Sequence, residues 1–475
     1  MRANMAYLLG LLASANLAVA FFRLPCAAPI VVERADPIVS PGQVSNHMHT
    51  IMGGNGFGFQ MDYAATQAST CSSCAVVQDK SNYWVPTVYY RAKNGTFTSV
   101  GQTGGALIYY LQRQDSSAVN LMAFPEGFRM VAGNPFLRSY NNTLEQQAIN
   151  WACIGSPHAD TNGFPDYNCP DGLRAQVFFP SCWNGKDLDT PDHKSHVAYP
   201  SGLTTGECPP GFPVQFVSIF YEVLWDTPDF ADMWYGNSQP FVLSHGDPTG
   251  YGLHGDFLNG WNVSVLQNAI DNCNNPDGIL EDCQYFTTVT PDIAASCQVP
   301  SSIDEQVFGT VDKLPGCNPV QNGPEMATAR SNCGAPTTIS KPNFPFVDLT
   351  KSKHFAYIGC GTDPGGQPRT LLGASEQNNN MTVESCVDFC VSKGYRIAGL
   401  EYSTQCFCDN SFSKDRAPVP GLLQDCSMPC SGNDKEVCGG GALISLYQKC
   451  TDSTCHNVQL TFINGTASSA AHKPH

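Results

Sequence analysis

Histidines and aspartates gather in three short segments of this 475-residue chain. The first segment, SNHMHT, carries His47 and His49 one residue apart. In a β-strand the side chains at positions i and i+2 point to the same face, so two such imidazoles can share a metal ion or a substrate proton. The other two segments are LDTPDHKSHVAYPSG at residues 188–202 and SHGDPTGYGLHGDFLNGW at residues 244–261.

The candidate catalytic residues are the imidazoles of these segments and the carboxylates beside them. Glycines next to polar groups let the backbone approach a ligand closely, and nearby carboxylates can orient a histidine. The candidates are His47, His49, Asp192, His193, His196, His254 and Asp256. No cofactor follows firmly from them. A divalent metal ion is the one they suggest, with His47, His49 and His254 as candidate ligands.

A structural role is the alternative for every one of these histidines, because a loop histidine often only bonds a backbone carbonyl or a neighbouring aspartate. We prefer that role for His245 and His158. A functional pocket requires the three segments to converge. We expect the imidazoles of His47, His49 and His254 to lie within reach of one another, with His193 or His196 nearby.

The elements that would position these segments are mainly strands. YWVPTVYYRAKNGTFTSV at residues 83–100 is aromatic and β-branched on both sides of Asn94-Gly95, which predicts a hairpin. Residues 106–113, 174–183 and 214–225 are further predicted strands. Helical spacing predicts a helix over residues 263–273 and a weaker one over 144–153. These patterns predict a mainly β fold, with a β-sandwich-like N-terminal domain that has long loops and few short helices.

The N-terminus and the cysteines predict a secreted protein. Arg2, an apolar run over residues 7–17 and the small residues Ala18-Val19-Ala20 are typical of a signal peptide cleaved after Ala20. The 22 cysteines are even in number, as expected for disulfides in an oxidising compartment. No later segment has the length of apolar sequence that a transmembrane anchor needs. Five Asn-x-Ser/Thr sequences are potential glycosylation sites, at Asn94, Asn141, Asn262, Asn380 and Asn464.

The net charge of −16 disfavours binding to nucleic acids and anionic membranes, which need basic patches, and suits neutral or cationic partners. Composition also divides the chain. We expect a signal peptide at residues 1–20, a β-rich domain at 21–333, a proline-containing linker at 334–352, a small disulfide-rich α+β module at 353–448 and a tail at 449–475.

The small module has eight cysteines between Cys360 and Cys438, which compensate for a core too small to stabilise it. Thr382 or Ser385 is placed to cap a short helix through Cys386 and Cys390. Exposed aromatic residues on such a scaffold often stack on sugar rings, and the alternative is that they form its core.

The cysteine-rich segments YIGCG, SCVDFCVSKGYRIAGLEYSTQCFCDNSF and DCSMPCSGNDKEVCGGGALISLYQ closely resemble the WSC domain, whose eight cysteines all have counterparts here. This resemblance implies an extracellular module that binds fungal cell-wall or related glycans. The residues that we would assign to glycan binding are Tyr402, Phe407, Tyr395 and Arg369.

The histidine segments carry a second resemblance. VSNHMHTIMGGNGF, FFPSCWNGKDLDTPDHKSHVAYPSG and GDPTGYGLHGDFLNGW are similar to the fungal secreted family catalogued as domain of unknown function 1996. The resemblance implies architecture and no established activity.

Three functions remain open at this point. The first is a carbohydrate-active enzyme tethered to fungal wall glucan or a similar polysaccharide, with Asp192, Asp256 or Glu222 as acid or base. The second is a non-catalytic protein of wall binding or adhesion. The third is extracellular metal capture by the histidines.

Overall fold

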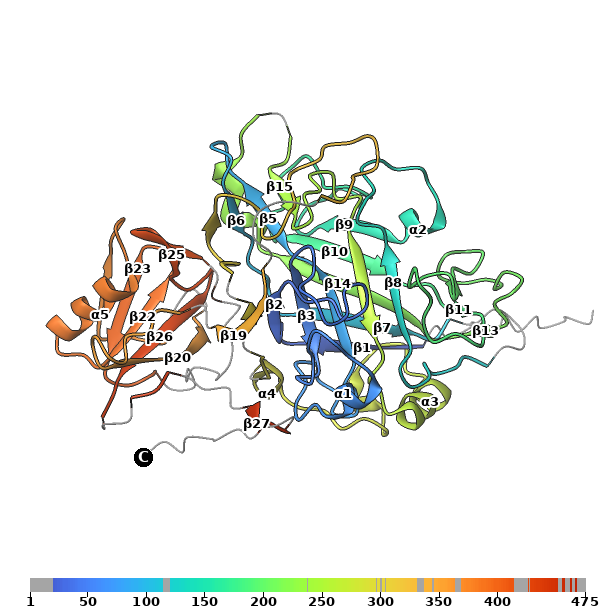
Figure 1. The fold of residues 1–475 in the computed structure, drawn as a ribbon. Helices are drawn as coiled ribbons and strands as arrows, with labels where there is room; N and C mark the ends of the chain where they lie inside the picture. The colour runs from blue at the N-terminus through green and yellow to red at the C-terminus, as the bar shows by residue number, and fades with distance from the viewer. Residues whose placement is uncertain are drawn as a thin grey trace, which may run out of the picture.

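The computed structural model describes residues 20–113, 120–236, 238–295, 297–299, 301–303, 305–330, 337–343, 346–363, 369–413, 426, 428–451, 455–457, 462–463 and 466–467. All of the predicted signal peptide except Ala20 lies outside the described residues. A large N-terminal domain and a smaller C-terminal module make up the described chain (Figure 1).

Two five-stranded sheets form the centre of the large domain. The strand order of the first sheet is β1 (Phe21–Cys26), β7 (Ala106–Leu111), β14 (Ser218–Trp225), β10 (Leu173–Phe178) and β9 (Ile149–Cys153). The strand order of the second is β2 (Val31–Glu33), β3 (His49–Gly53), β4 (Asn82–Pro86), β16 (His254–Leu258) and β8 (Arg129–Gly133). Neighbouring strands in both sheets are antiparallel. The prediction of a mainly β fold is confirmed.

Buried aromatic side chains fill the space between the two sheets. The hydroxyls of Tyr83 and Tyr110, from opposite sheets, lie 2.8 Å apart. Tyr221 donates a hydrogen bond across the interior to the backbone oxygen of Asp256 at 2.9 Å. Each of these three tyrosine hydroxyls has a polar partner, so they join the sheets without being left unpaired.

Short sheets and helices surround this sandwich. The predicted hairpin forms between β5 (Val88–Arg91) and β6 (Phe97–Ser99), and Gly95 in its turn has a positive φ of 94°. β15 (Phe241–Leu243) and β18 (Thr310–Val311) extend that sheet on its two sides. β11 (Cys182–Trp183) pairs with β12 (Val197–Ala198) and with β13 (Val214–Gln215). The helices are α1 (Tyr63–Gln67), α2 (Leu144–Gln147), η1 (Thr227–Met233), α3 (Val263–Asn272), η2 (Leu280–Asp282) and α4 (Pro291–Ala295).

The helix predicted over residues 144–153 is wrong in its second half. Helix α2 ends at Gln147, and residues 149–153 form strand β9. The side chains of Ile149, Trp151 and Cys153 are buried against β10, and their alternation fits a strand at the sheet edge. Tertiary pairing therefore outweighs the weak helical spacing of this segment. Helix α3 agrees with its prediction, and Asn262 caps it by accepting from the Val265 N–H.

Part of the predicted linker pairs with the large domain. β19 (Ile339–Asn343) forms an antiparallel pair with β17 (Ser301–Ile303). Upstream of β19, the hydroxyl of Thr337 accepts a hydrogen bond from the Arg34 guanidinium. The described part of this segment therefore runs along the first domain.

Disulfides stabilise both parts of the chain, and every cysteine among the described residues is bonded. Cys71 and Cys74 belong to two different bridges, to Cys297 and Cys26 respectively. Closing a loop of 226 residues removes much entropy from the unfolded chain.

The C-terminal module is a five-stranded antiparallel sheet with one helix against it. Its strand order is β20 (Phe355–Thr362), β26 (Leu443–Lys449), β22 (Ile397–Glu401), β23 (Gln405–Asp409) and β21 (Ala374–Gln377). Two disulfides, Cys386–Cys406 and Cys390–Cys408, join helix α5 (Val383–Ser392) to β23. Pairs β24 (Pro429–Cys430) with β25 (Asn433–Val437), and β27 (Phe462–Ile463) with β28 (Thr466–Ala467), complete the described strands.

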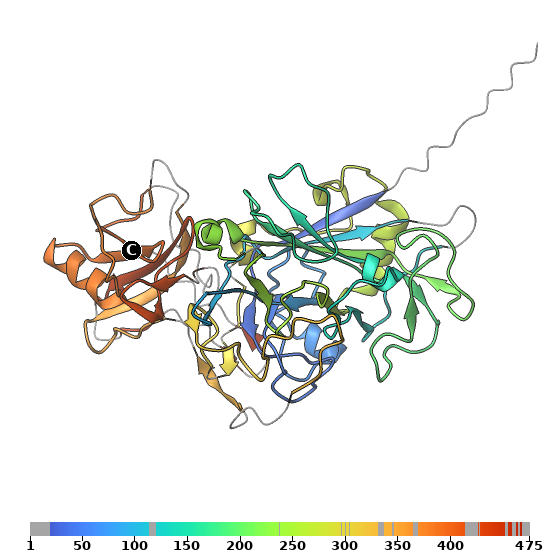
Figure 2. The same cartoon turned by 90° about the horizontal axis from the view of Figure 1, so that it is seen from above.

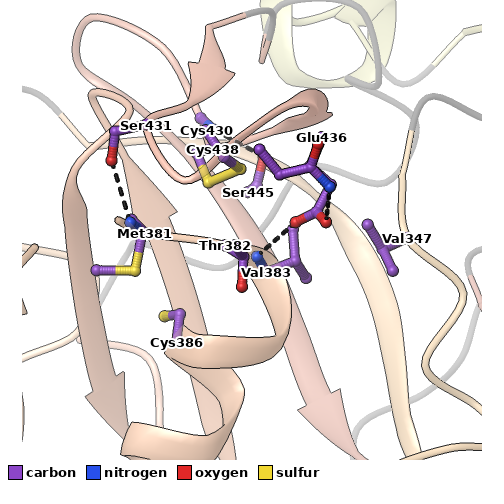
Figure 3. The surroundings of a disulfide bond; sticks show 12 residues. Val347, Met381, Thr382, Val383, Cys386, Cys430, Ser431, Glu436, Cys438 and Ser445 are labelled. Carbon is purple, nitrogen blue, oxygen red and sulfur yellow. Dashed lines mark hydrogen bonds between the residues drawn. A yellow bond between two sulfur atoms is a disulfide. The ribbon is translucent and has the colours of Figure 1, made fainter. Parts of the chain in front are cut away.

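The start of α5 shows how the small module is held (Figure 3). The Thr382 side chain caps the helix by accepting from the Ser385 backbone N–H, and the Ser385 side chain accepts from the Thr382 backbone N–H. Both predicted capping residues therefore take part. Glu436 on β25 accepts from the Val383 N–H at 2.8 Å. The nearby Cys430–Cys438 disulfide closes the loop that carries this glutamate.

Helix η1 of the large domain lies beside the C-terminal module (yellow-green in Figure 2). A Cβ at Gly441 would lie 3.3 Å from Asp226 Oδ2 and 3.5 Å from Asp229 Oδ1. Burial, followed by the neighbouring charge of Asp226, raises the pKa of Asp229 to about 7. A second contact joins Ala28 and Ala295 to the Cys360–Cys426 bridge. Carboxylates therefore lie against the module at the first of these described contacts.

The pKa of Asp229 predicts a pH-dependent stability. A carboxyl whose pKa is raised in the folded state favours folding while it is protonated, and this contribution is lost as the pH rises through about 7. Replacing Asp229 by asparagine removes that loss. We therefore expect the melting temperature of Asp229→Asn to exceed that of the wild type by a margin that grows from pH 4 to about pH 7 and is constant above it.

Thermal unfolding by circular dichroism at several pH values measures this margin. The matched control is Asp232→Asn, on the same helix but exposed. Parallel pH profiles for the wild type and Asp229→Asn would contradict the prediction.

Candidate functional site

Four histidines meet at one end of the second sheet. His49 begins β3 and lies beside Pro86 of β4. Asp256 of β16 pairs with Trp84 on the other side of β4, so His254, two residues earlier, flanks the same end of β4. His47 precedes β3, so only one residue of the His-x-His pair is in the strand.

The fourth histidine, His245, lies in the turn after β15. Ser244 donates to the Met48 carbonyl at 2.7 Å, which fastens this turn to the segment that carries His47. A buried ion pair holds the same turn, with Arg138 Nε 3.4 Å from Asp247 Oδ1. Asp247 also accepts from the Gly252 N–H at 2.7 Å. The turn is thus held rigidly beside the His-x-His segment.

The four rings contact one another. His47 lies 4.3 Å from His49, 5.2 Å from His245 and 5.1 Å from His254, measured between ring centroids. His245 and His254 are 5.3 Å apart, and His49 and His254 are 5.9 Å apart. The Nε2 atoms of His47 and His254 are separated by 3.1 Å. The expected convergence of His47, His49 and His254 is therefore present in the structure.

Two of the rings are oriented by backbone carbonyls. His49 Nδ1 lies 3.0 Å from the oxygen of Ala35, and His254 Nδ1 lies 2.9 Å from the oxygen of Gly252. A carbonyl can only accept, so each Nδ1 carries the proton and each Nε2 offers a lone pair. Both nitrogens of His245 and Nε2 of His49 are buried without a hydrogen-bond partner.

Burial keeps these imidazoles neutral. Desolvation is the main cause that lowers the pKa of His47, His49 and His245 well below the usual value, and the neighbouring imidazoles lower it further. Desolvation also lowers the pKa of His254, to about 4. As residues, His49, His245 and His254 are buried and His47 is half-buried. Near pH 7 the cluster therefore presents neutral imidazoles with free lone pairs.

Buried carboxyls lie next to the imidazoles. One nitrogen each of His49 and His254 and an oxygen of Asp256 lie within 4.8 Å of one another. Burial, followed by the charge of Asp36, raises the pKa of Asp256 well above the usual value. Its Oδ2 has no hydrogen-bond partner. Asp256 is therefore a buried carboxyl that favours its protonated form.

The segment around residue 190 contributes fewer side chains to the imidazole cluster than its histidines and aspartates suggest. His193 Nδ1 lies 2.8 Å from Asp189 Oδ1, and the charge of His193 acts on the buried carboxyl of Asp36. His196 is buried, and its nitrogens face Arg129 O at 2.8 Å and Thr190 Oγ1 at 3.0 Å.

Asp192 is exposed and accepts bonds from Thr190, Lys194 and Ser195 of its own loop. These hydrogen bonds, led by the one from the Ser195 backbone, lower its pKa. His196 and Asp192 are thus occupied in holding their loop.

Glu222 lies in the other sheet, away from the imidazoles. It forms an ion pair with Arg174 at 3.1 Å and accepts from Tyr109 at 3.0 Å. With Arg174, Thr103 and Leu224 it lines a cavity of about 270 Å³. Asp192, Asp256 and Glu222 therefore occupy three different environments.

His245 is the member of the site that sequence reasoning assigned to a structural role. In the structure its ring lies against those of His47 and His254, so by position it belongs to the cluster. The available signal was its glycine-rich turn, SHGDPTGYG, which resembles the surroundings of His47 and His254. His158 lies on the exposed surface with its ring 4.2 Å from that of Tyr167.

The candidate glycan-binding residues of the small module are spread over one sheet and its rim. Tyr402 is 45% exposed and lies near helix η1. Desolvation is the main cause that raises the pKa of its hydroxyl, and the charges of the nearby aspartates raise it further. Phe407 is half-buried under the Arg369 guanidinium, at 4.3 Å from the ring centroid. Arg369 bridges Asp363 at 3.0 Å and Glu401 at 2.6 Å. Tyr395 packs against the module core.

Comparison with known proteins agrees with these two parts. The family model described as domain of unknown function (DUF1996) matches residues 36–261, and that of the WSC domain matches residues 357–440. The chain therefore carries a DUF1996 region followed by a WSC domain, as its segments predicted. All four imidazoles of the cluster lie within the first match.

Several known proteins resemble part of the chain. A WSC domain-containing protein of Arthroderma benhamiae is 37% identical over 167 residues, which are 34% of this chain and 17% of that protein. A putative fungistatic metabolite of Chaetomium globosum is 36% identical over 139 residues, 26% of this chain and 60% of its own length. Kremen protein 2 of Mus musculus is 37% identical over 104 residues, 22% of each chain. The chain thus spans less than two thirds of each of these relatives.

The disulfides and the WSC domain are features of an extracellular protein. Within the described part of the chain, each helix is too short or too polar to cross a lipid bilayer.

Gly252 offers a test of how tightly the cluster is packed. A Cβ at this position would lie 2.6 Å from His245 Nε2 and 3.0 Å from the Pro135 oxygen. We therefore expect Gly252→Ala to displace the His245 ring and to lower the free energy of unfolding by about 1–3 kcal/mol.

Chemical denaturation measures the change. The matched control is Gly58→Ala, because a Cβ at Gly58 meets nothing within 4 Å. Equal stability of the two variants would show that the packing around His245 is looser than in this structure.

Proposed function

We propose that this chain is a secreted protein of the cell wall or extracellular space that acts on a polysaccharide. In this proposal the WSC domain holds the glycan and the histidine pocket of the first domain acts on it. The observation that carries the first half is the WSC match over residues 357–440, with all eight of its cysteines in disulfides. The four-imidazole cluster supports the second half.

The free-energy cost of burying unpaired ring nitrogens argues that this cluster has a function. A buried polar atom without a hydrogen bond costs about 1–3 kcal/mol. His49 and His245 together leave three ring nitrogens in this state. A protein that served only for adhesion would gain stability from apolar side chains at these positions, so such a set is more readily explained by a ligand or a reaction.

Hydrolysis by a pair of carboxylates is not the activity that we propose. That mechanism needs two carboxyl groups about 5–9.5 Å apart across one glycosidic bond. Asp192 holds its own loop, Glu222 is paired with Arg174 in the other sheet, and Asp256 is buried beside imidazoles. Chemistry at the imidazoles is the better supported version of the enzyme hypothesis.

Features of the whole chain support the proposed extracellular location and the proposed polysaccharide partner. A chain with a signal-like N-terminus, many disulfides and potential glycosylation sites suits the secretory pathway. A net charge of −16 suits a neutral or cationic polysaccharide, and fungal wall glucan or a related glycan fits this description.

Retention of the full-length protein on insoluble polysaccharide tests the binding half. We expect Tyr402→Ala to weaken retention on wall glucan roughly two- to tenfold, because stacking of an aromatic ring contributes about 0.5–1.5 kcal/mol. The matched control is Tyr140→Ala, since Tyr140 is 38% exposed on the large domain. Depletion binding curves give the two dissociation constants.

Retention of Tyr402→Ala equal to that of the wild type would remove this ring from the binding surface. Phe407→Ala would then test the ring under Arg369. The absence of retention on every wall polysaccharide tried would overturn the binding proposal itself.

Incubating the purified chain with the same polysaccharides tests the second half. We expect new reducing, oxidised or unsaturated ends, measured by mass spectrometry of the soluble products, and expect His254→Gln to lower their yield at least tenfold. Retention without new ends would favour the non-catalytic alternative of wall binding or adhesion.

A further inference from the structure

We propose that His47, His245 and His254 bind one divalent ion of the late first-row transition metals, Zn²⁺ or Cu²⁺, through ring nitrogens. The inference deepens the proposed function, since it assigns the chemistry of the histidine pocket, and it depends on that function only for the choice of substrate. It rests on three observations, which are the spacing of the nitrogens, the lack of protein partners at His245 and the orientation of the His254 ring.

The spacing of the nitrogens suits a single ion. One nitrogen from each of His47, His245 and His254 lies within 4.8 Å of the other two. The Nε2 atoms of His47 and His254 are 3.1 Å apart. Two nitrogens bound tetrahedrally to zinc at about 2.0–2.1 Å are separated by about 3.3 Å. Small rotations of the rings therefore bring the nitrogens to bonding distance.

The lack of partners leaves the nitrogens available. His245 is 9% exposed, and neither of its ring nitrogens has a hydrogen bond. His254 is 3% exposed, and its Nε2 has only His47 as a partner. A buried imidazole normally satisfies at least one nitrogen with a protein group. A bound cation would supply the partner that His245 lacks.

The orientation of His254 matches that of a metal ligand. Metal-binding histidines usually donate the second ring N–H to a carbonyl or a carboxylate, which fixes the tautomer. His254 Nδ1 does this with the Gly252 oxygen at 2.9 Å, and His49 Nδ1 does the same with Ala35 at 3.0 Å. The Nε2 lone pairs of both rings are thereby directed away from these carbonyls.

The donor set selects the class of metal. Imidazole nitrogens suit Zn²⁺, Cu²⁺, Ni²⁺ or Fe²⁺, whereas Mg²⁺ and Ca²⁺ prefer carboxylate, carbonyl and water oxygens. The three proposed ligands contribute nitrogen alone. Within this class, Cu²⁺ binds nitrogen sites most tightly. Zn²⁺ is commonly bound by histidine nitrogens.

Three protein ligands leave one coordination position for water or substrate, as in catalytic zinc sites. Of the three ligands, only His47 is half-buried as a residue. His254 also has two other polar neighbours. A nitrogen of His49 and an oxygen of Asp256 lie within 4.8 Å of one of its nitrogens. The Nε2 of His49 is also buried without a hydrogen-bond partner.

Isothermal titration of the full-length, chelator-treated chain with Zn²⁺ and with Cu²⁺ tests the proposal. We expect one ion per chain for at least one of the two metals. We expect His47→Ala and His254→Gln each to weaken the binding at least tenfold, because even the loss of an outer-shell partner costs about 10–100-fold. The matched control is His158→Ala, an exposed histidine outside the cluster, which should leave the affinity unchanged.

The proposal is overturned if the folded wild type binds neither metal at one per chain, or if the cluster variants bind as tightly as His158→Ala. If the variants fail to fold, electron paramagnetic resonance of the Cu²⁺-loaded wild type decides: hyperfine coupling to three or more nitrogens supports the site, and oxygen coordination alone overturns it. Glycan retention is measured on the same samples. Because the cluster and the WSC domain lie in different parts of the chain, loss of one activity without the other tells the two proposals apart.

Discussion

The pairing of β4 with β3 on one side and with β16 on the other is the constraint on which the histidine cluster depends. This pairing brings His49 and His254, more than 200 positions apart in the sequence, to the same end of one sheet. Backbone hydrogen bonds fix the register, and a slip of one residue would turn both side chains to the opposite face. The turn after β15 then adds His245, and its bond to the Met48 carbonyl holds it beside His47.

The rest of the large domain keeps this pairing rigid. Tyrosine hydroxyls bond across the sandwich, and long-range disulfides close loops around it. The Arg138–Asp247 ion pair is buried on both sides, so its loss would leave a charge without compensation below the His245 turn. Such support allows the domain to tolerate ring nitrogens that lack partners, since those groups would otherwise favour local rearrangement.

The WSC domain obtains its stability in a different manner. Its helix and sheet are joined by disulfides at Cys386 and Cys390, and its remaining core is small. One face of its sheet carries Phe407, Arg369 and Glu401 away from that helix. Tyr402 lies where the module approaches the aspartates of η1, so a glycan held near this ring would also be near the large domain. The two halves of the proposed function are thereby brought together on one chain.

The sequence by itself determined the β class, the hairpin at Asn94-Gly95, helix α3, the capped helix of the small module and the order of the two families, because these depend on local periodicity, turn chemistry and cysteine spacing. It also placed His47, His49 and His254 in one group, together with His193, His196 and Asp256. Only the tertiary structure decided that His245 joins them and that His196 and Asp192 are occupied in their own loop. It also made residues 149–153 a strand. The physical reason is that burial and pairing across long sequence separations, which no local pattern encodes, decide which polar atoms find partners and which remain free to bind.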